Sequence, residues 1–177
     1  DPVKVCLYKN IPVGSGLGGG SSNAAFFLKA MNNIFSLHLG ASDLELLAAK
    51  IGADCPFFIK NKAAVATGTG NVFSPIDNPV SRMFITVVFP QIRISTKDAF
   101  TKIKAAKSYN MITCLGSKRS IWKNDLKNDF EEIVAREFPE IAKIKNRLYE
   151  SGAVFASLTG SGSALYALST KPLNTGV

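Results

Sequence analysis

The residues best suited to chemistry form a glycine-rich stretch near the start of the sequence. Residues 12–25 contain five glycines and two adjacent serines, Ser21 and Ser22, and lead directly into a segment with helical spacing. Glycines let backbone N–H groups approach an anion closely, and a helix N-terminus adds unpaired N–H groups and the positive end of its dipole. This combination favours a phosphate-bearing ligand such as a nucleoside triphosphate.

The elements that must position this loop are a strand before it and a helix after it. Val3, Val5 and Leu7 occupy alternate positions, which predicts a half-buried strand. From Ala24 onward, apolar residues recur at spacings of four, three and four, which predicts a helix. Ser21 or Ser22 can cap that helix. The predicted unit is therefore strand, glycine loop and helix.

Three known kinds of glycine loop fit less well. The Walker loop needs a lysine and then Ser or Thr directly after its last glycine, and no lysine stands at that place. A Rossmann fingerprint is formally present over residues 14–19, but the acids that follow at the required distance, Asp43 and Glu45, open another predicted helix. A protein-kinase loop requires a His-Arg-Asp segment, and the only histidine is His38 in a Leu-His-Leu run.

The stretch resembles the ATP loop of the galactokinase, homoserine kinase, mevalonate kinase and phosphomevalonate kinase superfamily. Residues 12–25 match its pattern P-x-x-x-G-L-G/A-G/S-S-S/A-x-A nearly position by position. Residues 51–59 and 157–168 resemble the second and third motifs of the branch that phosphorylates 4-diphosphocytidyl-2-C-methyl-D-erythritol. Residues 128–131 and 138–141 are also similar to that branch. The order of these motifs is specific, and the resemblance covers almost the whole chain.

The resemblance implies a role for each residue of the matched motifs. Asp54 is implied as the catalytic carboxylate, which accepts the proton of the substrate hydroxyl or orients its oxygen. The implied cofactors are ATP and Mg²⁺, with Ser22 as the candidate metal ligand. The implied nucleotide-binding residues are Pro12, Gly14, Gly16, Leu17, Gly18, Gly19, Gly20, Ser21, Ser22 and Asn23. The implied substrate-binding residues are Thr96, Phe100, Thr159, Gly160, Ser161 and Gly162.

Several of these residues also have a plain structural interpretation. Asp54 is a turn aspartate before a proline, and such residues often make only local hydrogen bonds. Phe100 fits a core phenylalanine as well as an aromatic ring that stacks on the substrate's cytosine. Asn23 fits an ordinary residue of the first helical turn, and residues 159–163 fit a turn at a strand end. The sequence leaves these alternatives open.

Composition bounds the class of protein. The chain has 177 residues, is 46% hydrophobic and carries a net charge of +8. Basic residues crowd residues 97–127, which raises the possibility of nucleic-acid binding. Their spacing instead indicates amphipathic helices with a solvated basic face, and no nucleic-acid motif accompanies them. We therefore expect no nucleic-acid partner, and a basic surface can also steer anionic small ligands.

Cysteines and apolar runs give further bounds. Three scattered cysteines and one histidine argue against a disulfide framework and against a zinc site. No apolar run reaches the roughly 18 residues of a membrane span, and no signal peptide opens the sequence. We expect a soluble protein of the bacterial cytoplasm or a plastid, monomeric or homodimeric, without a membrane partner.

Spacing and turn residues predict an α+β organisation with two parts. A second helix is predicted to begin at a capping box of Ser42 and Glu45. A strand is predicted near residues 63–66. A buried strand is predicted over 83–89. Beyond it come helices near 96–107, 125–138 and 141–150, and strands at 154–156 and 165–168. We place a boundary between residues 1–78, an ATP-binding domain, and residues 79–177, a substrate-side domain. The resemblance implies an incomplete ribosomal-protein-S5-like first half and a ferredoxin-like second half.

The sequence contains no counterpart of the superfamily's first motif, P-A-K-I-N-L, which carries a lysine implied to be catalytic. We therefore expect an incomplete version of a longer enzyme. The resemblance implies ATP-dependent phosphorylation of the 2-hydroxyl of 4-diphosphocytidyl-2-C-methyl-D-erythritol, a step of the non-mevalonate route to isoprenoid precursors. Two alternatives stay open: a homoserine- or mevalonate-type kinase, and a non-catalytic module that binds a nucleotide or RNA.

Overall fold

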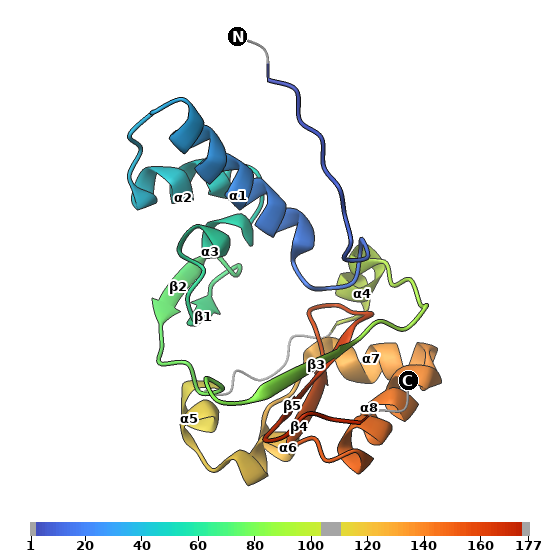
Figure 1. Ribbon diagram of the computed structural model, residues 1–177. Helices are drawn as coiled ribbons and strands as arrows, with labels where there is room; N and C mark the ends of the chain where they lie inside the picture. Colours follow the sequence, from blue (N-terminus) through green and yellow to red (C-terminus); the bar gives the residue numbers. More distant parts are fainter. Residues whose placement is uncertain (1–2, 104–110, 175–177) are drawn as a thin grey trace.

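The computed structural model describes residues 3–103 and 111–174 of the chain (Figure 1). Helices and strands are both present among these residues, which confirms the α+β class. In chain order the described elements are α1 (Gly19–Ile34), α2 (Ala41–Ala49), α3 (Cys55–Lys60), β1 (Ala64–Thr67), β2 (Val72–Pro75), β3 (Phe84–Val88), α4 (Thr96–Lys102), α5 (Met111–Gly116), the short 3-10 helix η1 (Arg119–Ile121), α6 (Trp122–Asp125), α7 (Asp129–Glu137), α8 (Pro139–Glu150), β4 (Phe155–Leu158) and β5 (Leu165–Ser169).

The first part of the chain is a group of three helices followed by a hairpin. Helices α1, α2 and α3 pack on one another, and β1 and β2 pair as an antiparallel hairpin next to them (Figure 1). The core of this group is small because its buried residues are few and mostly short; they are Ala25, Leu44, Ala48, Cys55 and Ile59. This group holds the glycine loop at the start of α1 and Asp54 at the start of α3.

The second part is an antiparallel sheet of order β3-β5-β4 that is covered by helices α7 and α8 (Figure 1). Strand β5 lies in the middle, with Val88 opposite Leu165 on one side and Leu158 opposite Leu165 on the other. Ile141 and Leu148 of α8 are buried against this sheet. Trp122 and Phe155 form a smaller second cluster, with their rings edge to face at 6.4 Å. The larger hydrophobic core therefore lies behind the strands that carry the third motif.

The strand predicted before the glycine loop is absent. Residues 3–10 have no regular secondary structure, and Val3, Val5 and Leu7 are 49, 58 and 60% exposed. Alternating side chains are necessary for a half-buried strand, but the strand forms only when its backbone finds a pairing partner. No such partner pairs with this segment among the described residues.

The predicted starts of the first two helices are displaced. Helix α1 begins at Gly19 with Gly18 as its N-cap, so Ser21 and Ser22 lie inside the first turn and do not cap it. Helix α2 begins at Ala41, and the N–H of Gly40 donates to Oδ2 of Asp43 at 3.1 Å. The predicted box of Ser42 and Glu45 is therefore wrong by two residues. Glu45 forms an ion pair instead, at 2.8 Å from Nζ of Lys60.

Other boundaries also differ from the prediction. Residues 55–60 form helix α3, although the sequence indicated only a turn at Asp54 before a proline, and Pro56 fits the first helical turn. Strand β3 forms as predicted but lies at the sheet edge, where Ile85 is 60% exposed rather than buried. The helix expected over 125–138 begins only at Asp129. Helix α4 is described to Lys102, and the rest of the predicted 96–107 helix lies largely outside the described residues.

Two further features concern the chain as a whole. Within residues 3–103 and 111–174, none of the helices combines the length and the apolar character that crossing a bilayer demands.

The proposed division after residue 78 falls in the connection between β2 and β3, and it stays a prediction.

Candidate active site

The glycine loop adopts a conformation that exposes backbone N–H groups at the start of a helix. Gly14, Gly16 and Gly18 all have positive φ angles, of 75, 80 and 66°. The first helical hydrogen bond of α1 is donated by Ser22 to the carbonyl of Gly18 at 2.9 Å, so the three preceding N–H groups have no partner within the helix. The loop and its flanks line an open hollow of about 550 Å³. This arrangement is that of an anion-binding helix N-terminus.

The turn of the third motif docks directly on this loop. Residues 159–163 lie in the connection between β4 and β5, and the hydroxyl of Thr159 donates to the carbonyl of Gly16 at 3.0 Å. The N–H of Ala164 donates to the carbonyl of Ser15 at 3.0 Å. Ser15 is buried under this contact, at 7% exposure. The structure therefore joins residues 143 positions apart in the sequence into one surface.

The loop and the turn approach each other so closely that side chains are excluded at the contact. A Cβ atom on Gly16 would lie 2.1 Å from the carbonyl oxygen of Thr159 and 2.9 Å from that of Gly162. A Cβ on Gly160 would lie 3.1 Å from the carbonyl oxygen of Gly16. These glycines serve backbone-to-backbone packing as well as any approach to a ligand.

Asp54 shares a cavity with the glycine loop and the turn. It is the N-cap residue of α3, its side chain makes no capping hydrogen bond, and it is exposed. A cavity of about 410 Å³ is lined by Gly16, Leu17, Gly18, Asp54, Phe57, Phe58, Ala64, Ala66, Gly70, Phe73 and Thr159. Three of the lining residues are phenylalanines, and the rings of Phe57 and Phe58 lie edge to face at 5.1 Å. Asp54 thus lines the same cavity as part of the candidate phosphate loop.

The predicted substrate residues divide into two groups. Of the six, all of which the structure describes, Thr159 alone lines the cavity of Asp54. Thr96 and Ser161 contact each other, with their hydroxyl oxygens 3.0 Å apart, so α4 also meets the turn. Phe100 is 62% exposed, which makes the core interpretation wrong. Its ring contacts Phe130 edge to face at 4.9 Å.

Among the nucleotide residues, Pro12, Asn23 and the loop between them all line the 550 Å³ hollow. Asn23 and Ser22 are half-buried residues of the first turns of α1. Within the described part of the chain, no group of three or more His, Cys, Asp or Glu side chains could hold a metal ion. A divalent cation at this loop would therefore depend on phosphate oxygens, water and single protein ligands, as Mg²⁺ commonly does.

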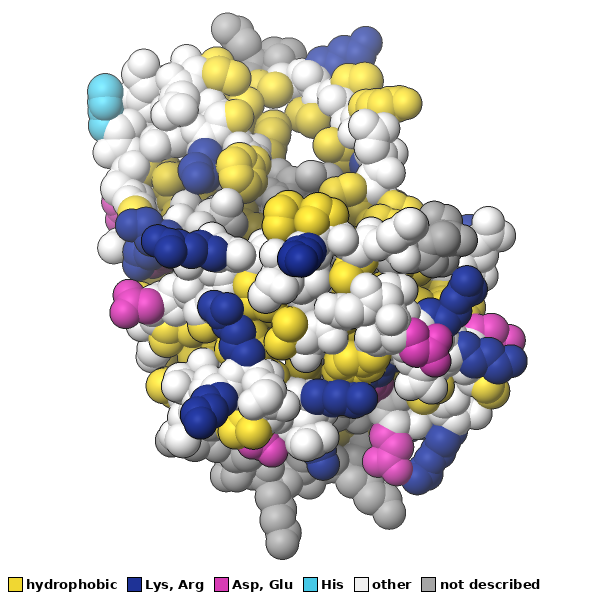
Figure 2. All heavy atoms as spheres, turned by 60° about the horizontal axis from the view of Figure 1, so that its bottom comes forward, with side chains coloured by type: hydrophobic (Ala, Val, Ile, Leu, Met, Phe, Trp, Pro, Cys, Tyr) yellow, Lys and Arg dark blue, Asp and Glu magenta, His cyan; other side chains and the backbone are white. Residues whose placement is uncertain are grey.

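The basic residues are spread over the surface and partly neutralised by acids. Figure 2 shows Lys and Arg side chains distributed over one face with Asp and Glu side chains among them. Nζ of Lys102 lies 2.6 Å from Oε2 of Glu137, and this hydrogen bond raises the pKa of the lysine. Arg136 pairs with Glu132 at 2.6 Å. Lys104 and Lys107 lie outside the described residues.

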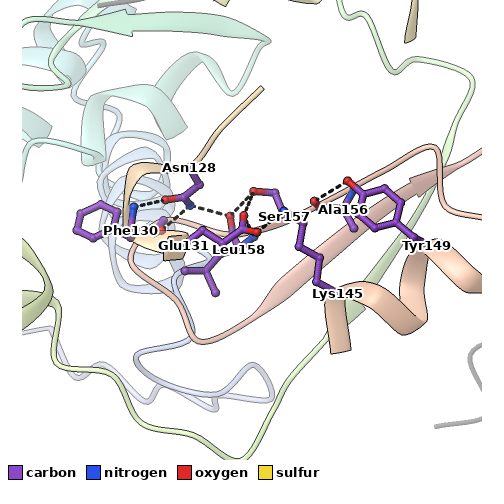
Figure 3. A network of polar contacts seen from close by, with 9 residues as sticks. Asn128, Phe130, Glu131, Lys145, Tyr149, Ala156, Ser157 and Leu158 are labelled. Carbon is purple, nitrogen blue, oxygen red and sulfur yellow. Dashed lines mark hydrogen bonds and ion pairs between the residues drawn. The ribbon is translucent and has the colours of Figure 1, made fainter. Parts of the chain in front are cut away.

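One set of contacts escaped the sequence analysis. Asn128, Glu131, Lys145 and Ser157 form a polar network behind the turn (Figure 3). Beside it, burial raises the pKa of the Tyr149 hydroxyl, which accepts a hydrogen bond from the N–H of Ala156 at 3.2 Å. The matched run 128–131 was the only signal in the sequence, and it gave no indication of what the residues contact.

Two family models match separate parts of the chain. The model described as the N-terminal domain of GHMP kinases, the acronym of the four kinases of the superfamily, matches residues 1–62. The model described as the C-terminal part of GHMP kinases matches residues 114–174. The first match contains the glycine loop and Asp54, and the second contains the third-motif turn.

Individual relatives agree with these matches. A protein of Bacteroides fragilis named 4-diphosphocytidyl-2-C-methyl-D-erythritol kinase is 46% identical over 168 residues, which are 94% of this chain and 61% of the relative. A protein of the same name from Azobacteroides pseudotrichonymphae is 43% identical over 172 residues, 96% of this chain and 64% of the relative. A crystal structure of 4-(cytidine 5'-diphospho)-2C-methyl-D-erythritol kinase superposes with a TM-score of 0.76 at 30% identity, covering 93% of this chain and 60% of that one. The chain thus spans about three fifths of the length of these relatives.

Proposed function

We propose that this chain, which belongs to the GHMP kinase family, forms the ATP-binding part of an enzyme. That enzyme phosphorylates the 2-hydroxyl of 4-diphosphocytidyl-2-C-methyl-D-erythritol. The observation that carries this proposal is the cavity that Asp54 shares with Gly16, Gly18 and Thr159. A phosphate loop, a carboxylate and a hydroxyl-bearing turn meet there, and phosphoryl transfer uses such a loop together with a residue that orients or deprotonates the nucleophile. The substrate is taken from the relatives' names.

The glycine loop binds the β- and γ-phosphates in this proposal. The N–H groups of Gly19, Gly20 and Ser21 precede the first helical hydrogen bond and remain available to phosphate oxygens. The positive end of the α1 dipole stabilises the same negative charge. Such preformed donors need no reorganisation when charge moves from the γ-phosphoryl group to the leaving ADP, so they favour the transition state.

Asp54 acts on the substrate hydroxyl. The hydroxyl oxygen forms a bond to the γ-phosphorus, the bond between that phosphorus and the ADP oxygen breaks, and the hydroxyl proton passes to the carboxylate. Because Asp54 is exposed and makes no capping hydrogen bond to α3, its oxygens are available for this role. Its place at a helix start fixes the backbone from which it reaches into the cavity.

Mg²⁺ fits the loop as a partner of the nucleotide. The hydroxyl of Ser22, in the first turn of α1, would supply a single hard oxygen ligand, and phosphate oxygens and water would supply the remaining positions. When bound, the ion supplies neutralisation of the charge on the phosphates.

Thr96, Phe100 and Ser161 form the proposed substrate side. The hydroxyls of Thr96 and Ser161 lie 3.0 Å apart next to the turn. The exposed ring of Phe100 can stack on a pyrimidine base. Because the relatives described above are bacterial, we place the reaction in the bacterial cytoplasm, with a plastid as the other compartment of the prediction.

A substrate comparison on the full-length gene product tests the function. We expect ATP-dependent ADP release with 4-diphosphocytidyl-2-C-methyl-D-erythritol, and much less with homoserine or mevalonate. The variant Asp54→Asn keeps the size of the side chain and removes the proton acceptor, so kcat should fall by about 100-fold or more. The KM for ATP should change by no more than a few-fold, because the loop is untouched.

The matched control is Asp77→Asn, which makes the same chemical change at an exposed position between β2 and β3. Its turnover should equal that of the wild type. If Asp54→Asn stays within a few-fold of wild-type turnover, the catalytic assignment is wrong. If homoserine or mevalonate is the better substrate, the substrate assignment is wrong and the kinase assignment stands.

A further inference from the structure

Asn128 connects the start of α7 to the third-motif turn by three hydrogen bonds. Its Oδ1 accepts from the N–H of Phe130 at 2.9 Å, which caps the helix. Its Nδ2 donates to the carbonyls of Leu158 and Gly160, both at 2.8 Å (Figure 3). The reversed amide would place its oxygen against two carbonyl oxygens, so the surroundings fix its orientation.

Capping alone does not require an asparagine at this position. Ser, Thr and Asp cap helices about as well, because each supplies an acceptor oxygen. Only the amide supplies that acceptor together with two donors on one short side chain. The two donors both go to the turn, on either side of Thr159. The choice of residue is therefore explained by the turn and not by the helix.

Glu131 holds the same strand end from one turn further along α7. Its carboxylate forms an ion pair with Lys145 of α8 and accepts from the hydroxyl of Ser157 at 3.1 Å. It lies 3.5 Å from the N–H of Leu158. Leu158 is thus held through its N–H by Glu131 and through its carbonyl by Asn128. The carboxylate of Glu131 lies in the first turn of α7 and the amide of Asn128 lies at its N-cap, so both groups move together with this helix.

The turn that these residues hold is the one that touches the glycine loop. Between the two carbonyls bound by Asn128 lies Thr159, whose hydroxyl donates to Gly16 at 3.0 Å. The backbone of Gly16 packs against the same turn without room for a Cβ. A shift of the turn by a few tenths of an ångström would therefore displace the loop or break this contact.

We propose that Asn128, supported by Glu131, is a positioning residue that sets nucleotide affinity by holding the third-motif turn against the glycine loop. The inference rests on the proposed function of that loop as an ATP site. Asn128 is not a catalytic residue, because it contacts the turn and the helix and acts on the loop only through the turn.

The variant Asn128→Asp tests this role. It keeps the helix cap and replaces both donors by an acceptor that faces two carbonyl oxygens. We expect the dissociation constant for a non-hydrolysable ATP analogue with Mg²⁺, measured by calorimetry on the full-length gene product, to rise about tenfold. The KM for ATP should rise with it, while kcat at saturating ATP should fall much less.

A second variant and a control separate positioning from stability. Asn128→Ser keeps a capping oxygen without adding charge, and it too should weaken analogue binding, by about tenfold or somewhat less. Asn146→Asp makes the same charge change at an exposed position of α8 and should leave binding unchanged. Urea unfolding of each variant confirms that binding is measured on folded protein.

The outcomes are distinguishable. If both Asn128 variants lower the free energy of unfolding but bind the analogue as tightly as the wild type does, Asn128 is only structural and the inference is wrong. That result would leave the proposed function intact. If the wild type itself does not bind the analogue, the ATP site is wrong and the positioning role fails with it.

Discussion

Glycines of the loop serve two different contacts that look alike in the sequence. Gly16 lies against the backbone of Thr159 and Gly162, whereas Gly18 is the N-cap of α1 and lies next to the ring of Phe58. The sequence motif predicts that both glycines let a phosphate approach the backbone. That role can be predicted because the motif lies within one short stretch of the chain. The contact of Gly16 with a turn 143 residues away has no local signal. Gly16 is therefore required by the fold as well as by any ligand.

The substitution Gly16→Ala should lower the free energy of unfolding more than an ordinary glycine substitution does. An added Cβ would lie 2.1 Å from the carbonyl oxygen of Thr159, and the φ angle of +80° is unfavourable for alanine. We expect the free energy of unfolding to fall by about 2 to 4 kcal/mol in urea denaturation. Gly116→Ala is the control, because nothing lies within 4 Å of its added Cβ. Equal stabilities of the two variants would contradict the docking of loop and turn.

At the scale of elements, the sequence predicted what depends on neighbours along the chain and missed what depends on partners in space. The glycine loop, the helix after it and strand β5 follow from local patterns, and all three formed. Residues 3–8 alternate like a strand but pair with none of the described strands. The apolar run of β3 indicated a buried strand, yet its place at the sheet edge leaves Ile85 exposed. Pairing and burial depend on sheet order, which periodicity does not contain.

The candidate site divides in the same way. Asp54 and the loop lie on short matched motifs, so their types and positions could be read directly. Their common cavity depends on how α3 packs against α1, and the network of Asn128 depends on contacts 30 and 32 residues apart. Side-chain amides and carboxylates have many uses, so the residue type alone does not indicate the partner.

The cap of α2 gives a test at this scale. Asp43 accepts from the N–H of Gly40 at 3.1 Å, whereas Ser42, which the sequence had favoured, makes no capping bond. We expect Asp43→Ala to lower the free energy of unfolding by about 0.5 to 1 kcal/mol, through loss of this bond and of a favourable charge near the helix N-terminus. Ser42→Ala should change it by less than about 0.5 kcal/mol. Thermal or urea unfolding compares the two; a larger effect at Ser42 would restore the original prediction.

For the whole molecule, the loop-turn contact is the point where the two parts meet at the candidate site. The helical group supplies the loop and Asp54, and the sheet supplies the turn that docks on them (Figure 1). Each part has its own hydrophobic core. A ligand bound at the loop will therefore stabilise the sheet only to the extent that this contact joins the two cores into one cooperative unit.

Hydrogen exchange measures that cooperativity. With an ATP analogue at about 100 times its dissociation constant, amides that exchange by global unfolding should slow about 100-fold. If the parts unfold together, Ala25 of α1 and Ala167 of β5, both fully buried, should slow by the same factor. If they unfold independently, Ala25 alone should slow. Under saturating analogue, we expect Gly16→Ala to replace equal slowing of both amides by slowing of Ala25 alone. The variant breaks the contact between loop and turn without altering either core. Identical slowing of Ala167 in the variant and the wild type would mean that the parts are coupled elsewhere.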